Sequence, residues 1–215
     1  MDSNTAGHIV LLGDSIFDNK AYVNGGPDVV EQLRGELPPG WMATLLAVDG
    51  DVIAGVDRQL RALPDGATHL VISAGGNDAL GFANLLEAPA QSVAEAVTMF
   101  ADAQERFAAD YELMAEALSA TGLPVAVCTI YDTPSAGPYY RIIRTALTVF
   151  NDCVTRAAFT RGLSVLDLRI ICNHNGDYAN ALEPSAQGGA KIAGAIAALL
   201  DPGRQVPRST VIGGS

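Results

Sequence analysis

The chain has 215 residues, 49% of them hydrophobic, which is enough to bury the core of one ordinary domain. Its 24 acidic and 13 basic residues give a formal net charge of −11. Such a surface is repelled by phosphate backbones, so we expect no nucleic-acid partner. No apolar run approaches the roughly 20 residues of a membrane span, and the polar start lacks the order of a signal peptide. We therefore expect a soluble, cytoplasmic protein without a membrane partner.

Five short apolar runs alternate with helical patterns along the chain. The predicted strands are residues 8–12, 43–48, 68–73, 124–130 and 164–170, and the predicted helices are residues 27–36, 53–63, 91–120, 139–161 and 186–200. Most of the strands are nearly continuous apolar runs, which is typical of parallel strands covered on both faces. The alternation predicts a three-layer α/β domain over residues 1–201. Residues 202–215, rich in proline, glycine and serine, are expected to form a flexible tail.

Polar residues and glycines follow the first three predicted strands where those strands end. In chain order they are Gly13-Asp14-Ser15, Asp49-Gly50-Asp51 and Gly75-Gly76-Asn77-Asp78. Because α/β folds bind ligands at the carboxyl ends of parallel strands, we expect these segments to border one cleft. Ser15 is a candidate nucleophile there, although a serine in a turn also serves as a helix N-cap. Asn77 is a candidate donor to an oxyanion, although Gly-Asn-Asp is also ordinary turn chemistry.

This order of motifs resembles that of the SGNH (GDSL-type) hydrolases, and the resemblance extends from about residue 8 to residue 200. It implies a flavodoxin-like sandwich with a five-stranded parallel sheet. It also implies hydrolysis of carboxylic esters, with Ser15 as the acyl-accepting nucleophile. The resemblance assigns the oxyanion hole to the Ser15 N–H, the Gly50 N–H and the Asn77 side chain.

The last motif departs from the family pattern, which has Asp-x-x-His followed by Pro-Ser and a glycine. Here Asn180 and Glu183 occupy the positions of the aspartate and the histidine, while Pro184, Ser185 and Gly188 keep the frame. The histidine that would activate the serine is therefore absent from its usual position.

Three interpretations of this motif stay open. In the first, Glu183 is the base and Asn180 orients it by donating an amide N–H to its carboxylate. A free glutamate has a pKa near ~4.3, so this base needs burial to raise its pKa. In the second, His174 from the same loop is the base. In the third, the fold is retained as a non-catalytic binding protein. We expect the first, in a serine esterase that acts on small or medium acyl esters through an acyl-enzyme on Ser15.

Metal and cofactor sites are not indicated by the sequence. Cys128, Cys153 and Cys172 are widely spaced and form no Cys-x-x-Cys pair. No glycine-rich nucleotide-binding pattern follows the first strand. We therefore expect neither a metal nor an organic cofactor, and a small-molecule ester as the binding partner.

Overall fold

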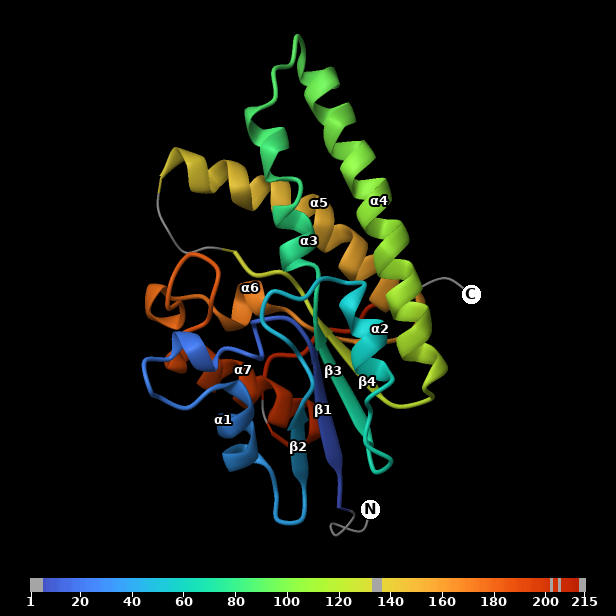
Figure 1. Cartoon of the computed structure of the whole chain (residues 1–215), viewed down its shortest axis with the longest axis vertical. Coiled ribbons are helices and arrows are strands. Elements are labelled where there is room, and N and C mark those ends of the chain that lie inside the picture. The colour runs from blue at the N-terminus through green and yellow to red at the C-terminus, as the bar shows by residue number, and fades with distance from the viewer. Residues whose placement is uncertain (1–5, 133–136, 202, 205, 213–215) are drawn as a thin grey trace.

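The computed structural model describes residues 6–132, 137–201, 203–204 and 206–212. Five strands form one parallel sheet in the order β2-β1-β3-β4-β5 (Figure 1). The strands are β1 (His8–Gly13), β2 (Met42–Leu45), β3 (His69–Ser73), β4 (Val125–Cys128) and β5 (Ser164–Leu166). This order places β1 between β2 and β3, as in doubly wound flavodoxin-like sheets. The predicted α/β fold with five parallel strands is confirmed.

Helices follow the strands and begin at recognisable caps. The α-helices are α1 (Val29–Glu36), α2 (Gly55–Leu60), α3 (Gly76–Leu80), α4 (Val93–Ala120), α5 (Pro138–Thr160), α6 (Leu168–Ile171) and α7 (Ala186–Leu200), and three short 3₁₀ helices are η1 (Lys20–Tyr22), η2 (Ala83–Glu87) and η3 (Asn175–Asp177). The side chains of Asp28, Ser92 and Ser185 accept backbone N–H groups at the starts of α1, α4 and α7. Such caps satisfy backbone donors that have no partner within the helix.

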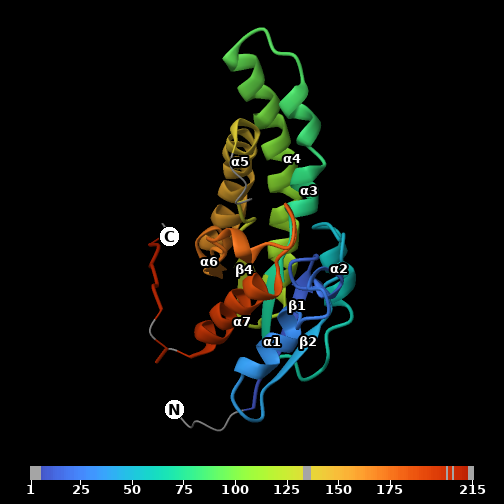
Figure 2. The ribbon, with the colours of Figure 1, turned by 90° about the vertical axis from the view of Figure 1, so that its left-hand side faces the viewer.

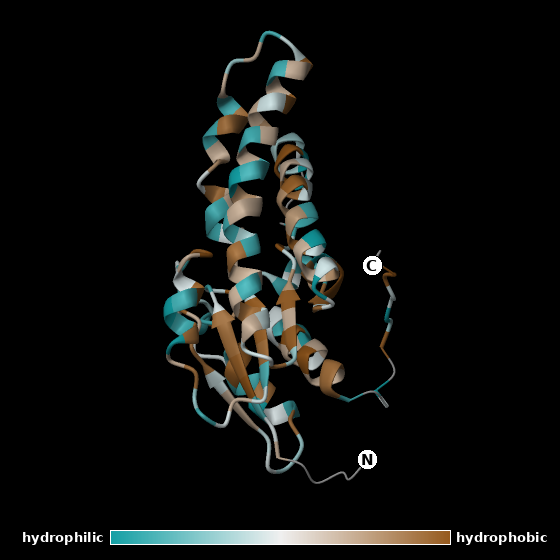
Figure 3. Ribbon diagram, turned by 90° about the vertical axis from the view of Figure 1, so that its right-hand side faces the viewer, coloured by the Kyte–Doolittle hydropathy of each residue, from teal (hydrophilic) through white to brown (hydrophobic). Residues whose placement is uncertain are grey.

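The sheet carries a hydrophobic core on each face, because successive side chains of a strand point to opposite sides. Along β1, Val10 and Leu12 pack with α2, α4 and α5, whereas Ile9 and Leu11 pack with α1 and α7. Figure 3 shows the central strands of the sheet largely in brown, the colour of hydrophobic residues. The three-layer arrangement therefore follows from strands that are apolar on both faces.

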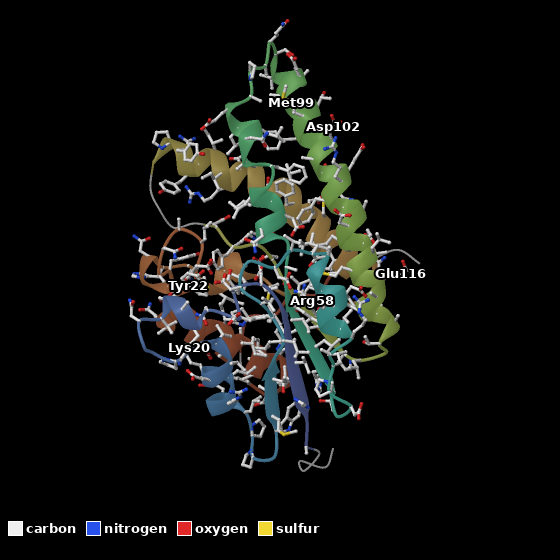
Figure 4. All side chains as sticks on the ribbon, in the orientation of Figure 1. Lys20, Tyr22, Arg58, Met99, Asp102 and Glu116 are labelled. Atoms are coloured by element: carbon white, nitrogen blue, oxygen red, sulfur yellow. The ribbon has the colours of Figure 1, made fainter. Side chains whose placement is uncertain are left out.

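The helix pairs α4–α5 and α3–η2 extend well beyond the carboxyl edge of the sheet (Figures 1 and 2). Helix α4 has 28 residues, which corresponds to about 42 Å at 1.5 Å per residue. Its buried residues begin only at Ala103. Met99 and Asp102 lie toward the end of α4 that projects away from the sheet (Figure 4). We call the projecting parts of α4 and α5, residues 93–102 and 138–149, the arms.

The fifth strand is shorter than the sequence pattern predicts. It ends at Leu166, whereas the prediction extended it to residue 170. The side chain of Asp167 accepts the Arg169 N–H and caps α6, so the apolar residues that follow are helical. Of the predicted tail, residues 202, 205 and 213–215 lie outside the described residues, and the others form neither helix nor strand. Within the described ranges, no helix is long and apolar enough to cross a membrane.

Candidate active site

The turn after β1 brings Ser15 to the carboxyl edge of the sheet. Gly13 has a φ of +114°, and a Cβ there would lie 1.7 Å from the Ser73 carbonyl oxygen, so the position requires glycine. The Asp14 N–H donates to that same oxygen at 3.0 Å. The chain therefore turns tightly against the end of β3 and leaves the Ser15 hydroxyl pointing out of the sheet edge, where it lines a cavity.

Ser15 and Glu183 meet across 168 residues of sequence. The Ser15 hydroxyl donates to the Glu183 Oε1 atom at 3.1 Å, and both residues are buried. The other carboxylate oxygen, Oε2, is buried and has no hydrogen-bond partner among the described residues. Burial raises the pKa of Glu183, the Ser15 hydrogen bond lowers it, and the charge of Asp49 raises it, with a net increase. Glu183 is thus a stronger base than an ordinary glutamate, and it lies within reach of a serine proton.

Asn180 holds the Glu183 loop by a different contact from the predicted one. Its Oδ1 atom accepts the backbone N–H groups of Leu182 at 2.8 Å and of Glu183 at 2.9 Å. The predicted hydrogen bond from the Asn180 amide to the Glu183 carboxylate is not among those of the described chain. The Asn180 side chain thus accepts hydrogen bonds from its own loop and stabilises the turn. It does not donate to the Glu183 carboxylate.

Tyr131, in the segment that follows β4, also positions the Glu183 loop, a role that the sequence pattern does not predict. Its hydroxyl donates to the Leu182 carbonyl oxygen, directly before Glu183. On the other side, the Ala179 N–H donates to the Glu183 carbonyl oxygen at 2.8 Å. The sequence signal for Tyr131 is its place directly after the apolar run 124–130. A buried tyrosine there needs a hydrogen-bond partner for its hydroxyl group. These contacts hold the carboxylate on a fixed backbone.

Asn77 lies in the first turn of α3, which follows β3, and Gly50 lies in the turn after β2. The Asn77 Nδ2 atom donates to the Asp51 carbonyl oxygen at 2.7 Å, which fixes the amide and leaves its second hydrogen free to point elsewhere. Asn77 lines the same cavity as Ser15, whereas Gly50 is not among the residues that line it. Gly50 has a φ of +79° and is exposed. Its turn is held by the Asp18 carboxylate, which accepts the Asp49 N–H at 2.9 Å.

His174 lies in a capping structure away from the cavity lining. Its Nδ1 atom accepts the Gly176 N–H at 3.2 Å, and its own backbone N–H donates to the Asp177 carboxylate at 2.9 Å. That carboxylate forms an ion pair with Lys191 at 2.6 Å. His174 is exposed, and among the described hydrogen bonds none joins it to Ser15 or Glu183. The structure therefore brings together Ser15, Asn77 and Glu183 and leaves His174 outside the group.

The cavity beside Ser15 has a volume of about 230 Å³. Ser15, Asn77 and Glu183 line it at the sheet edge, and Tyr139 and Tyr140 line it from α5. The rest of its wall is mostly apolar and comes from α3, η2, α4 and α5, including Phe82, Leu86, Phe100, Ile143, Leu147 and Phe150. A few convergent polar groups at one end of an apolar cavity are typical of a site for a small, largely apolar molecule.

Asp14 is a second buried carboxyl group next to this site. The pKa of Asp14 is raised from 3.8 to about 7. Burial is the main cause and the Glu183 charge adds to it, whereas hydrogen bonds from the Ile16 N–H and the Ser73 side chain act in the opposite direction. The Ile16 N–H donates to the Asp14 Oδ1 atom at 3.1 Å. The negative charge of Glu183 thus adds to the effect of burial on the Asp14 carboxyl.

We expect Asp14→Asn to stabilise the protein at alkaline pH. A carboxyl group whose pKa is raised on folding favours the folded state below its unfolded pKa of 3.8, and that benefit is lost as the pH rises toward 7. Asparagine keeps an acceptor for the Ile16 N–H and carries no charge. The free energy of unfolding at about pH 8 should increase by roughly 2 to 4 kcal/mol, and its decrease between about pH 4 and 8 should become shallower. Urea unfolding at several pH values measures both.

The exposed carboxylate of Asp65 supplies the matched control for this experiment, because Asp65→Asn removes the same charge from the surface. An equal change in pH dependence for both variants would contradict a specific effect of the buried Asp14 carboxyl.

Solved structures of several enzymes share this fold. The chain is similar to an extracellular lipase from Streptomyces rimosus (18% identity, TM-score 0.66, covering 89% of this chain and 99% of that one). It is also similar to phospholipase A1 from Streptomyces albidoflavus NA297 (17%, 0.65, 90% and 99%). A third similar structure is the psychrotrophic esterase EstA from Pseudoalteromonas sp. (20%, 0.61, 91% and 99%). At these identities the likeness shows a shared fold. No curated protein sequence matches the chain.

The family to which these motifs belong is shown by a match that covers most of the sequence. The sequence model of the GDSL-like lipase/acylhydrolase family matches residues 11–191. This range begins within β1, just before Ser15, and ends within α7, after Glu183, so it contains the whole cavity edge described above. The chain therefore belongs to the GDSL-like lipase/acylhydrolase family.

Proposed function

We propose that the protein is a serine esterase in which Glu183 is the general base and Ser15 is the nucleophile. The observation that carries this proposal is the hydrogen bond from the Ser15 hydroxyl to the buried Glu183 carboxylate, at 3.1 Å. A general base must lie within hydrogen-bond reach of the proton that it removes, and Glu183 meets this condition. The adjoining apolar cavity supports a neutral carboxylic ester as the substrate.

In the proposed acylation step, the Ser15 Oγ atom attacks the ester carbonyl carbon while Glu183 takes the hydroxyl proton. The negative charge then develops on the carbonyl oxygen. The Ser15 N–H, the Gly50 N–H and the free Asn77 amide hydrogen would stabilise this oxyanion. Collapse of the tetrahedral intermediate breaks the bond to the leaving alkoxide, and Glu183 returns the proton to that oxygen. Ser15 is left acylated.

In the proposed deacylation step, a water molecule attacks the acyl carbon and Glu183 takes one of its protons. Collapse of the second intermediate releases the carboxylic acid, and the proton passes to the Ser15 oxygen. Because Asp14, Asp49 and Glu183 all lie near this point, the local potential is negative. Neutral esters can therefore enter, and the carboxylate product is repelled.

Covalent labelling with a neutral phosphate triester, diethyl p-nitrophenyl phosphate, tests this proposal. The reagent transfers its phosphoryl group to an activated serine and releases p-nitrophenol. We expect one diethylphosphoryl adduct, which peptide mass spectrometry places on Ser15, and we expect none in Ser15→Ala. An unlabelled wild-type protein that also fails to hydrolyse p-nitrophenyl acetate would contradict the esterase and favour a non-catalytic binding protein.

A further inference from the structure

A second cavity adjoins the first on the side away from Ser15. It has a volume of about 600 Å³ and lies between the two arms, where Val97, Ile142 and Val149 contribute to its lining. Leu86, Phe100 and Ala146 line both cavities. The two spaces are thus adjacent, and the sheet edge with Ser15 lies at the far end of the first one.

We infer that the two cavities together form one acyl-chain site, so that this esterase prefers esters with long, neutral acyl chains. This inference rests on the proposed function and adds to it the class of substrate. With the ester carbonyl at Ser15, the first methylenes would lie in the inner cavity. The distal part of the chain would pass Ala146 and Phe100 and lie between the arms.

The arms themselves support this occupant. Their apolar side chains are unusually exposed: Val97 is 60% exposed and Ile142 is 50% exposed, and both line the outer cavity. Burying them against an alkyl chain removes apolar surface from water on both partners. The arms extend past the core that covers the sheet, because α4 buries no residue before Ala103. Their apolar lining thus has no partner in the core of the domain.

Continuity favours an acyl chain over a lipid surface or a second copy of the protein. Charge does not distinguish these occupants at the arms, because Glu95 and Asp102 on the α4 arm are matched by Arg141 and Arg144 on the α5 arm. The outer cavity shares lining residues with the catalytic cavity. A chain attached at Ser15 therefore reaches it directly.

Chain-length profiles of Ala146→Trp test the inference. Ala146 is half-buried on α5, and a tryptophan there would fill the junction between the two cavities. With p-nitrophenyl acetate, octanoate and dodecanoate, wild-type kcat/KM should increase by about threefold per added methylene. In Ala146→Trp, the ratio of kcat/KM for the dodecanoate to kcat/KM for the acetate should fall at least tenfold. Equal changes for the acetate and the dodecanoate would overturn the inference.

Ala101→Trp is the matched control, because Ala101 is exposed on the α4 arm and lines neither cavity. It should keep the wild-type chain-length profile. Phe100→Ala provides a second variant that widens the junction, and it should increase the ratio of dodecanoate to acetate hydrolysis. If Ala101→Trp lost dodecanoate hydrolysis as strongly as Ala146→Trp, the loss would be a general surface effect. That result would overturn the inferred acyl-chain site.

Ligand binding separates this inference from the proposed catalysis. In Ser15→Ala, 1-dodecanol should displace the fluorescent probe N-phenyl-1-naphthylamine from the protein. In the double variant Ser15→Ala, Ala146→Trp, the 1-dodecanol concentration needed for half-displacement should be at least tenfold higher. This result would support the acyl-chain site even if no ester were hydrolysed. Equal displacement from both proteins would overturn it even if the esterase were active on acetate.

Discussion

Ser15→Ala will lower kcat/KM for p-nitrophenyl acetate by about 10⁴-fold or more, to the level set by residual binding and by the remaining oxyanion donors. The alanine removes the atom that would carry the acyl group. The rest of the site, including Asn77 held at 2.7 Å from the Asp51 carbonyl oxygen, keeps its supports. Initial rates of p-nitrophenol release, with the variant purified in the same way, measure the loss.

The fold of Ser15→Ala must be shown to persist for that result to be informative. The variant removes the one hydrogen-bond donor that the described chain provides to the Glu183 carboxylate. The pKa of Glu183 should therefore increase, and the free energy of unfolding at about pH 8 should fall by about 1 to 2 kcal/mol. A folded variant with wild-type hydrolysis would contradict a covalent role for Ser15 and would direct attention to direct attack by water.

Glu183→Gln is expected to lower kcat/KM by about 10³-fold, because glutamine has the shape of glutamate but cannot take the serine proton at neutral pH. Wild-type activity should increase with pH as Glu183 loses its proton. Because burial raises the pKa of Glu183 above its usual value of 4.5, the increase should lie at a higher pH than for an exposed glutamate. In Glu183→Gln this increase of activity with pH should be absent.

His174→Ala is the matched test of the competing base. His174 is exposed and its ring contacts the backbone of Gly176, so its loss should change kcat/KM by less than about threefold. A pH–rate profile from about pH 4 to 10 for both variants separates the two bases. If His174→Ala removed the activity and Glu183→Gln retained it, the assignment of the base would be wrong.

The prediction for β5 shows why local patterns fail at particular residues. In the run after Ser164, Asp167 and Arg169 interrupt the apolar residues, and the sequence pattern predicts strand to residue 170. In the structure Asp167 ends β5, because its carboxylate caps α6 and also pairs with Arg169 at 2.6 Å. A capping residue inside an apolar run is a local signal, but its effect depends on whether a neighbouring strand offers a partner for the next N–H groups. Here the Thr129 side chain accepts the Leu168 N–H instead.

Side-chain chemistry in the Glu183 loop depended still more on tertiary contacts. The sequence placed Asn180 three residues before Glu183 and suggested an amide donor to the carboxylate. In the folded loop the Asn180 oxygen accepts two backbone N–H groups, and the hydroxyl of Tyr131, from the segment after β4, donates to the Leu182 carbonyl oxygen. Asparagine has both a donor and an acceptor, so its spacing alone does not decide which group it uses.

By itself, the sequence determined that five strands exist, that α1, α2, α4, α5 and α7 exist, and that Ser15, Gly50 and Asn77 follow the first three strands. These features depend on hydropathy periods and on turn residues, which act over a few positions. Only the tertiary structure decided that Glu183 contacts Ser15 from 168 residues away, that His174 lies outside the cavity, and that the arms enclose a second apolar space. Such contacts depend on how whole elements pack, because the burial and partners of a side chain are set by residues far from it in sequence.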